Sequence, residues 1–205
     1  MTAKDNFRVS SVVLAAGRSA RMGEAKQLLH LGERTVLEQT LENVRRSRVD
    51  EIVLVLGFSS ETIRQQLPAR LLDGMKVVVN KDFAQGMASS LRAGLLGVAS
   101  EMDAALIVLA DQPFVRPETI DRIIERYRFS DAEIVIPFYK GSRGNPVLMD
   151  RSVFLESMAL EGDTGCRAIF GSHADGIIEL EVDDAGILLD IDSRDDYERL
   201  RAYDR

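Results

Sequence analysis

Residues 15–26, which read AAGRSARMGEAK, combine glycines and positive charges directly after a run of apolar residues. Gly17 and Gly23 allow backbone conformations and close approaches that a side chain would obstruct. Three cations lie within nine positions of one another, namely Arg18, Arg21 and Lys26. Glycines that expose the backbone and cations that neutralise charge together suit a bound phosphate. We therefore predict that this segment binds the phosphates of a ligand.

Two familiar phosphate-binding motifs do not fit this segment. The GxxxxGK[ST] motif needs a lysine directly after its second glycine, whereas Gly23 is followed by Glu24. The GxGxxG motif needs a glycine at position 19, which holds Ser19. The sequence thus disfavours a P-loop NTPase and a standard dinucleotide-binding fold. The alternative to a phosphate site is a surface loop with solvated charges.

Two acidic segments could hold a divalent cation. Asp111 follows the apolar run 105–109, so its carboxylate should lie at the carboxyl edge of the sheet, where ligands gather in open α/β folds. Asp192 lies in a second acidic segment, residues 189–193. Mg²⁺ typically takes one or two carboxylates together with phosphate oxygens and water. The alternatives are a turn role for Asp111 and a helix-capping role for Asp192 or Ser193.

A helix expected to begin after Gly86 offers a third binding element. Its first turn carries Ser89 and Ser90 within the segment NKDFAQGMASSLRAGL, residues 80–95. A helix N-terminus presents free N–H groups, and small hydroxyls beside them suit a nucleotide. The alternative is an ordinary capped helix.

The elements that must position these residues alternate along the chain. Continuous apolar runs predict buried strands, because a strand covered on both faces need not alternate; these runs are 9–14, 52–56, 76–79, 105–109 and 134–138. Amphipathic spacing predicts helices over 36–44, 60–67, 91–98 and 117–127. This alternation predicts an α/β fold, a three-layer α/β/α sandwich with a mostly parallel, Rossmann-like sheet.

The pattern loosens after Phe138. Residues 146–149, 176–182 and 187–190 are predicted as shorter strands that form a short antiparallel edge, and residues 195–203 as a closing helix. We find no repeat, low-complexity tract or Pro/Ser-rich linker. The sequence therefore predicts a single domain over residues 1–205.

Composition excludes several classes of protein. Hydrophobic residues make up 45% and charged residues 29%, which is typical of a globular protein. The single cysteine, Cys166, excludes an internal disulfide framework and a multi-cysteine metal cluster. A net charge of −7 argues against nucleic-acid binding, which needs a basic surface. Because no apolar run approaches about 20 residues and the first ten lack an apolar signal region, we expect no membrane segment and a cytoplasmic location.

The segment LAAGRSARMGEAK, residues 14–26, resembles the signature L-A-(A/G)-G-x-S-x-R-M-G-x-x-K of the MobA-like nucleotidyltransferases. Further resemblances extend over nearly the whole chain, and within the family they are greatest to the molybdenum cofactor cytidylyltransferases. The resemblance implies the α/β sandwich of nucleotide-diphospho-sugar transferases. Ala16 favours cytidylyl transfer, because guanylyltransferases of the family usually carry Ala-Gly-Gly where this chain has Ala-Ala-Gly.

The resemblance implies a role for each motif. Arg21, Lys26 and Asp111 form the catalytic set, and Asp111 and Asp192 bind Mg²⁺. Contacts to the nucleotide are implied for Leu14, Ala15, Ala16, Gly17, Arg18, Lys26, Asn80, Gly86, Ser89 and Ser90. The segments RGNP and GDTGCR are implied to bind the acceptor through Arg143, Gly144, Asn145, Pro146, Gly162, Asp163 and Gly165.

The reaction implied is nucleotidyl transfer. A phosphate oxygen of molybdenum-bearing molybdopterin attacks the α-phosphate of CTP, and pyrophosphate leaves. Catalysis of this kind rests on positioning and charge neutralisation, which fits a site built from cations, acids and glycine turns. A molybdoenzyme or its chaperone is a candidate recipient of the product.

Three alternatives remain open. The first is a related nucleotidyltransferase that uses GTP or a different phosphorylated acceptor. The second is a non-catalytic carrier or chaperone of the pterin cofactor. The third, a hydrolase or esterase, is disfavoured because the sequence has no GxSxG motif.

Overall fold

The computed structural model describes residues 6–18 and 25–201, and a central sheet organises them. The strands of this sheet are β1 (Val9–Ala15), β4 (Glu51–Leu56), β5 (Lys76–Val79), β6 (Ala104–Leu109), β7 (Ile134–Tyr139), β8 (Ser142–Arg143), β9 (Val147–Asp150) and β10 (Ile177–Glu181). A separate small hairpin pairs β2 (His30–Leu31) with β3 (Arg34–Thr35). The main sheet has the order β10-β7-β9-β6-β1-β4-β5, and β8 pairs with β7.

The centre of the sheet is parallel. β1 pairs with β4 on one side and with β6 on the other, so that Leu14 lies opposite both Val55 and Leu109. All five strands predicted from continuous apolar runs form in the sheet, but the prediction that residues 76–79 are buried is wrong, because β5 is an edge strand and Val79 is 42% exposed. Because neighbouring parallel strands end at the same edge, the segments that follow β1 and β6 leave the sheet side by side.

The predicted fold class is confirmed, but the antiparallel strands are arranged differently from the prediction. β9 runs between β6 and β7 inside the sheet, where Leu148 and Met149 are fully buried, and is not at an edge. The edge strand β10 is parallel to β7. The predicted strand at 187–190 is wrong: Ala185–Leu188 is a 3₁₀ turn, because the Asp184 carboxylate accepts a hydrogen bond from the Gly186 N–H.

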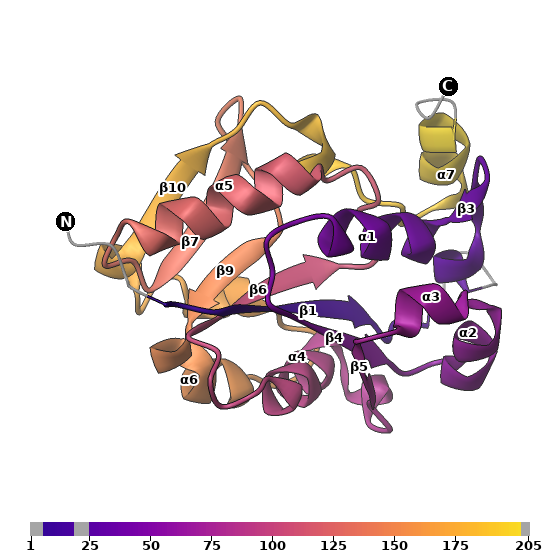
Figure 1. Ribbon diagram of the computed structural model, residues 1–205, viewed down its shortest axis with the longest axis horizontal. Coiled ribbons are helices and arrows are strands. Elements are labelled where there is room, and N and C mark those ends of the chain that lie inside the picture. The colour runs from indigo at the N-terminus through magenta and orange to yellow at the C-terminus, as the bar shows by residue number, and fades with distance from the viewer. Residues whose placement is uncertain (1–5, 19–24, 202–205) are drawn as a thin grey trace.

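Helices cover both faces of the sheet (Figure 1). Helices α1 (Val36–Arg45) and α5 (Pro117–Arg128) lie on one face, and α4 (Met87–Gly97) and α6 (Phe154–Met158) lie on the other. The remaining helices are α2 (Ser60–Gln66), α3 (Ala69–Leu72) and α7 (Arg194–Arg201). None of the helices in the described part of the chain is both long enough and apolar enough to cross a membrane.

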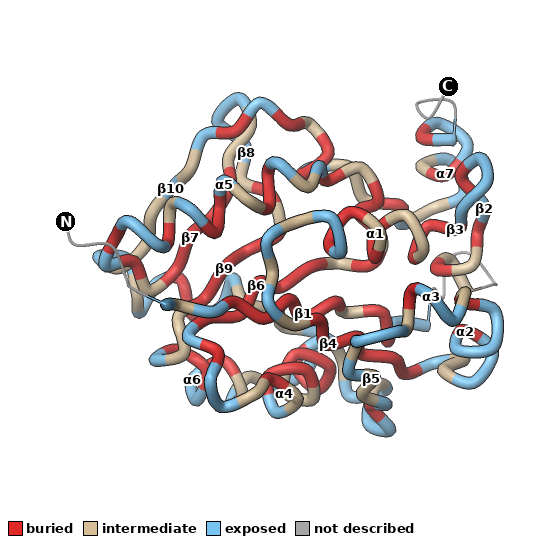
Figure 2. Tube along the Cα trace, viewed as in Figure 1, coloured by how far each residue is buried: buried red, intermediate tan, exposed pale blue. Residues whose placement is uncertain are grey.

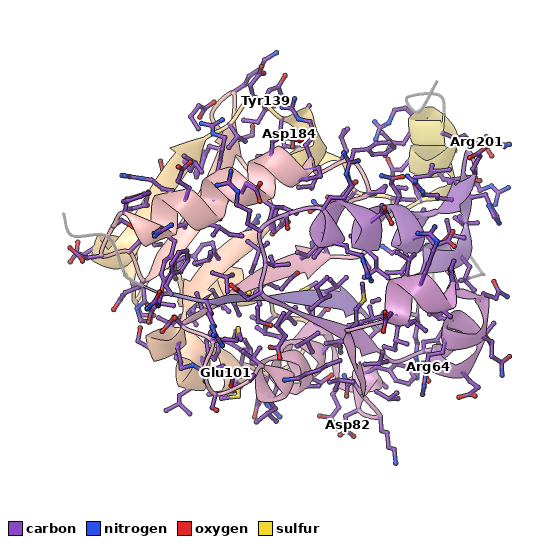
Figure 3. All side chains as sticks on the ribbon, in the orientation of Figure 1. Arg64, Asp82, Glu101, Tyr139, Asp184 and Arg201 are labelled. Atoms are coloured by element: carbon purple, nitrogen blue, oxygen red, sulfur yellow. The ribbon has the colours of Figure 1, made fainter. Side chains whose placement is uncertain are left out.

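Two apolar cores, one on each face, hold the three layers together. Val13 packs towards Leu41 and Ile123, and on the opposite face Val12 packs towards Leu91. Figure 2 shows the central strands mostly buried, with exposed residues on the outer surfaces of the helices. Charged side chains such as Arg64, Glu101 and Arg201 project from the periphery (Figure 3). Side chains that could bind a ligand therefore lie at the ends of the strands, in the loops and on the helices, because the central strands are buried.

Gly94 lets α4 lie directly on the sheet. A Cβ atom at this position would lie 2.3 Å from Val12 Cγ1 and 3.0 Å from Val55 Cγ2. Both valines are fully buried, so they have little room to move.

We expect Gly94→Val to lower the free energy of unfolding by about 2 kcal/mol and the Tm by about 6 °C, because it overpacks this contact. Thermal unfolding followed by circular dichroism measures the change. Gly171→Val is the matched control, since nothing lies within 4 Å of a Cβ at Gly171. Equal Tm values for the two variants would contradict the packing described for α4.

His173 joins two elements at the surface. Its Nδ1 lies 2.7 Å from a Glu133 oxygen and its Nε2 lies 2.7 Å from a Glu156 oxygen on α6. Hydrogen bonds to Glu133 and then to Glu156 raise the pKa of His173 above its ordinary value of 6.5.

The contribution of His173 to stability should therefore depend on pH. A histidine pKa that is raised in the folded state stabilises the protein below the unfolded pKa, and this stabilisation is lost as pH rises through the folded pKa. We expect the wild type to exceed His173→Gln in Tm by about 1–3 °C at pH 5.5 and to lose that advantage by pH 8.5. His30→Gln, at an exposed histidine, should show no such trend. A constant difference between wild type and His173→Gln would refute the assignment.

Candidate active site

A cleft opens at the carboxyl ends of β1 and β6. Two cavities of about 310 Å³ and about 270 Å³ adjoin there and share Leu14, Met87, Leu109 and Asp163 in their walls. The first cavity is lined by the end of β1, by the segment that follows β6 and by the start of α4. The second is lined by the residues before β9 and by the segment that contains Gly165.

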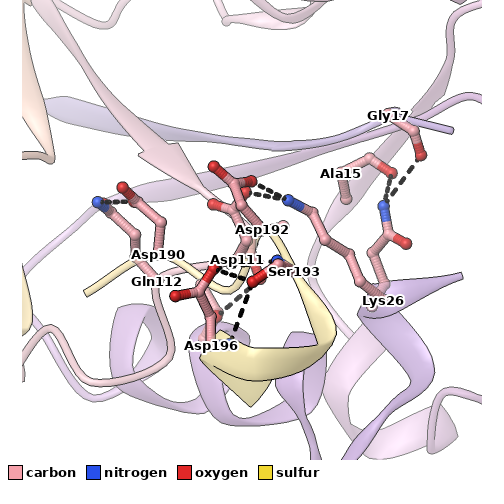
Figure 4. Close-up of polar contacts among 12 residues, drawn as sticks. Ala15, Gly17, Lys26, Asp111, Gln112, Asp190, Asp192, Ser193 and Asp196 are labelled. Carbon is pink, nitrogen blue, oxygen red and sulfur yellow. Dashed lines mark hydrogen bonds and ion pairs between the residues drawn. The ribbon is translucent and has the colours of Figure 1, made fainter. Parts of the chain in front are cut away.

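An ammonium group between two carboxylates forms the polar centre of the first cavity (Figure 4). Lys26 Nζ lies 2.5 Å from Asp111 Oδ2 and 2.9 Å from Asp192 Oδ1. The three side chains come from positions far apart in the sequence, and the fold brings all of them into the wall of the first cavity. This places together three of the four residues for which the sequence predicts catalysis or metal binding; the fourth, Arg21, lies outside the described residues.

The backbone that carries Lys26 is anchored to the end of β1. Lys26–Leu28 forms a 3₁₀ turn, and the buried Gln27 donates hydrogen bonds from Nε2 to the carbonyls of Ala15 and Gly17, at 3.2 and 3.3 Å. Sequence reasoning missed Gln27. The signal for it is a polar residue inside a stretch that folds back onto the sheet, directly between Lys26 and two leucines.

A backbone contact brings the two acidic segments together. The Ile191 N–H donates to the carbonyl of Asp111 at 3.1 Å, which holds the segment with Asp192 beside the end of β6. The capping role proposed as an alternative for Asp192 or Ser193 falls to Ser193, whose Oγ accepts from the Asp196 N–H at 3.2 Å. The Asp192 carboxylate is therefore free of the helix cap and faces Lys26.

The charges in this cluster affect one another strongly. Burial acts to lower the pKa of Lys26, but attraction and hydrogen bonding by Asp111, and then by Asp192, outweigh it and raise that pKa. Burial, and then repulsion by Asp111, raises the pKa of Asp190 to about 6, although Gln112 donates a hydrogen bond to it. The cluster thus concentrates carboxylates around the Lys26 ammonium.

The same donor set fits a divalent cation. Asp111 Oδ1 is buried and has no hydrogen-bond partner in the structure, so this oxygen is available to coordinate a cation. The carboxylates of Asp111 and Asp192 already converge on one positively charged atom. Across residues 6–18 and 25–201, no group of three or more His, Cys, Asp and Glu side chains could hold a metal by itself. A cation here would need further oxygens from water or phosphate, as Mg²⁺ commonly does.

The residues predicted to contact the nucleotide divide into a lining set and a supporting set. Lining the first cavity are Leu14, Ala16, Gly17, Arg18, Lys26, Gly86 and Ser90. Ala15 is buried, and its carbonyl holds Gln27. Asn80 donates from Nδ2 to Ser89 Oγ at 2.9 Å and to Ser90 Oγ at 3.1 Å, so Asn80 positions both serine hydroxyls.

Phe83 is a further lining residue that the sequence reasoning missed. The guanidinium of Arg18 lies 5.2 Å from the centre of the Phe83 ring, within cation–π range. An aromatic residue shortly before Gly86 was the signal available for it.

The segment 143–146 reaches the cleft because of where β9 lies. β9 runs antiparallel to β6, with Val147 opposite Ile107, so the residues that precede β9 emerge near the carboxyl end of β6. Arg143, Gly144 and Asn145 line the second cavity, whereas Pro146 is buried behind them and follows a cis peptide bond. This group of predicted acceptor residues therefore depends on the internal position of β9.

The second acceptor segment supplies Asp163 and Gly165 to the wall of the second cavity, next to Cys166 and Arg167. Burial raises the pKa of the Cys166 thiol to about 12, so the thiol stays neutral, as a packed small residue would. Gly162 is not in this wall.

Gly162 instead packs against Gly86 at the start of α4. Gly86 has φ +100°, and a Cβ there would lie 2.4 Å from the carbonyl carbon and oxygen of Gly162. The Ala88 N–H donates to the Gly162 carbonyl at 3.1 Å. This close approach joins a predicted nucleotide-binding segment to a predicted acceptor-binding segment.

Comparison with known proteins identifies a family match. The profile of the MobA-like NTP transferase domain matches residues 11–177. The structure of Rv0371c from Mycobacterium tuberculosis H37Rv is similar to this chain with a TM-score of 0.87 and 39% identity, over 98% of this chain and 100% of that chain. A structure of Rv0371c in complex with manganese is similar with a TM-score of 0.82 and 36% identity, over 95% and 98%.

Relatives whose names give an activity are 25–35% identical to this chain. The molybdenum cofactor cytidylyltransferase of Escherichia coli K12 is 25% identical over 92% of this chain and 93% of its own length. A probable molybdenum cofactor guanylyltransferase of Methanosarcina mazei is 35% identical over 64% of this chain and 58% of its own. The nicotine blue oxidoreductase of Paenarthrobacter nicotinovorans is 30% identical over 78% and 79%.

Gly86→Ala should separate the two segments that meet at the start of α4. Substitution of either Gly86 or Gly74 by alanine forces a side chain into a positive φ, and Gly86, with φ +100° and ψ −177°, also lies in a backbone region that is essentially restricted to glycine. Nothing lies within 4 Å of a Cβ at Gly74, so Gly74→Ala is the matched control. We expect Gly86→Ala to lose about 2 kcal/mol more than Gly74→Ala in urea unfolding, because its Cβ collides with backbone. Equal losses would show that the close approach is not needed.

Proposed function

This chain belongs to the MobA-like NTP transferase family and is a nucleotidyltransferase of that family, and on that premise we propose that it transfers CMP from CTP to the phosphate of molybdenum-bearing molybdopterin. The observation that carries this proposal is the Lys26 ammonium held between Asp111 and Asp192 in a cleft at the carboxyl ends of β1 and β6. Cations and acids at one sheet edge, with a glycine-containing turn, are suited to a nucleoside triphosphate.

The reaction exchanges one phosphorus–oxygen bond for another. An oxygen of the acceptor phosphate forms a bond to the α-phosphorus of CTP, the α–β anhydride bond breaks, and pyrophosphate leaves with the bonding electron pair. A phosphate monoester has a second pKa of about 6, so the attacking oxygen is largely ionised at neutral pH and no protein base is required.

Charge neutralisation is the task of this chain's own residues. Lys26 offsets the charge that grows on the departing pyrophosphate, and Arg21 shares this role in the proposal. Asp111 and Asp192 are the residues that would hold Mg²⁺, which when bound neutralises phosphate oxygens. The manganese complex of the Mycobacterium tuberculosis relative supports a divalent cation in this family.

The second cavity is the proposed acceptor site. Arg143 and Arg167 in its wall provide positive charge for a phosphorylated ligand, and the apolar side chains of Leu91 and Ile107 provide a surface for a flat ring. Asp163 lies in the walls of both cavities, so acceptor and nucleotide would meet beside it.

We also propose that a single nucleotidyltransferase domain spans residues 1–205. In this proposal the enzyme acts in the cytoplasm, and a molybdoenzyme or its chaperone receives the product.

We expect Lys26→Ala and Asp111→Ala each to lower the rate of pyrophosphate release at least about 100-fold, because each removes a charge that acts on the reacting phosphates. The assay combines CTP, Mg²⁺ and molybdenum-bearing molybdopterin, and circular dichroism checks the fold. Lys76→Ala is the control, since Lys76 pairs with Glu51 at the amino end of the sheet. Normal release by either site variant would contradict the assignment, and pterin binding without any release by the wild type would favour the carrier alternative.

Base preference is a separate prediction that rests on Ala16, which lines the first cavity. We expect kcat/KM with CTP to exceed that with GTP by about tenfold or more, and Ala16→Gly to reduce the ratio. Parallel assays at matched nucleotide concentrations measure it. A preference for GTP would remove cytidylyl transfer and leave nucleotidyl transfer in place.

A further inference from the structure

The contacts of Lys26 suggest that one position in the cleft serves two cations in turn. We propose that the Lys26 ammonium occupies the position of the divalent cation until a nucleotide binds, and that it then moves to the triphosphate and leaves Asp111 and Asp192 to the metal. This inference rests on the proposed function, because it assigns those two acids to a metal and the cavity to a nucleotide.

The ammonium and a metal ion would compete for the same two carboxylates. Both carboxylates contact one nitrogen, at 2.5 and 2.9 Å. A metal ion held by Asp111 and Asp192 together would share these two carboxylates with the ammonium, even if it used the Asp111 Oδ1 atom that Lys26 does not contact. Metal and ammonium therefore compete for the same negative charge, and two cations so close together repel each other while the side chains keep these positions.

Displacing the ammonium from the two carboxylates costs free energy when no other anion is bound. The Lys26 side chain is only 15% exposed and that of Asp111 only 19%, so both charges are largely removed from water. A buried charge that loses its partner is strongly disfavoured. Metal alone would thus bind against the cost of breaking the ion pairs of Lys26 with Asp111 and Asp192.

A bound triphosphate would offset the cost of separating the Lys26 ammonium from the two carboxylates. The first cavity, of about 310 Å³, is bounded by Gly17, Arg18 and Gly86 as well as by the three charged residues. A triphosphate there would provide anionic oxygens for Lys26 and additional ligands for the metal. The lysine stem is flexible, while its backbone is fixed by the hydrogen bonds of Gln27 to β1, so the ammonium can move without movement of the loop.

Metal and nucleotide binding must then be coupled through Lys26. By reciprocity, each ligand raises the affinity for the other by the same factor. Removal of the ammonium should lower this coupling by making the carboxylates available to metal from the start. A variant without the Lys26 ammonium would then bind the metal more tightly than the wild type, although it releases pyrophosphate more slowly.

The test is Mn²⁺ binding to the nucleotide-free protein, measured by electron paramagnetic resonance of free Mn²⁺. We expect Lys26→Met to bind Mn²⁺ about tenfold or more tightly than the wild type, because a hydrogen-bonded ion pair no longer opposes the metal. Lys76→Met is the matched control, since it also removes one lysine from an ion pair with an acid but lies at the opposite edge of the sheet; its Mn²⁺ affinity should equal that of the wild type. Adding Asp111→Asn to Lys26→Met should abolish the gain.

A second measurement protects the result against poor folding. Addition of Mn²⁺ without nucleotide should raise the Tm of Lys26→Met more than that of the wild type, and Lys26→Gln provides a second variant if Lys26→Met does not fold. Equal or weaker Mn²⁺ binding by these variants than by the wild type would overturn the exchange. Because the assay contains neither CTP nor acceptor, that result leaves the proposed reaction standing, and absence of pyrophosphate release in the other assay leaves the exchange standing.

Discussion

Repulsion among carboxylates at the edge of a buried sheet is the constraint around which the cleft is built. Asp111, Asp190 and Asp192 converge where β6 ends, and Lys26 is the cation placed in contact with two of them. Partly buried acids of like charge are stable together only when a cation or a proton compensates them. The raised pKa of Asp190 and the ion pairs of Lys26 are two responses to this same crowding.

The parallel centre of the sheet creates this crowding. β1 and β6 end at one edge, so the turn that carries Lys26 and the turn that carries Asp111 leave the sheet as neighbours. The contact of the Ile191 N–H with the Asp111 carbonyl then adds the last acidic segment. A site assembled from three segments in this way can be assembled only by a folded chain.

Close approaches between backbones make the two cavities one cleft. Gly86 packs against Gly162, and a Cβ at Gly144 would lie 2.5 Å from the carbonyl oxygen of Ile187. At Gly86 the glycine lets the segment with Gly162 reach the start of α4, and at Gly144 it lets the segment before β9 approach the 3₁₀ turn Ala185–Leu188. The first of these contacts brings a predicted acceptor segment beside a predicted nucleotide segment, which a transfer between two bound ligands requires.

Local patterns in the sequence were sufficient to determine the layered fold and the five strands, because apolar runs act over a few residues, but they did not show that β5 lies at an exposed edge. Glycine–cation spacing predicted the loop with Lys26 as a place of chemistry. The family resemblance assigned Asp111 and Asp192 to one site, and the structure brings their carboxylates to the same ammonium. The tertiary structure decided what depends on distant partners. β9 lies inside the sheet because both of its faces are buried by residues far away in sequence, and this position carries Arg143 to the cleft. The roles of Gln27 and Phe83 in the site likewise depend on partners that only folding brings near. The same holds for the pairing of Lys26 with two acids, because no local pattern contains these contacts.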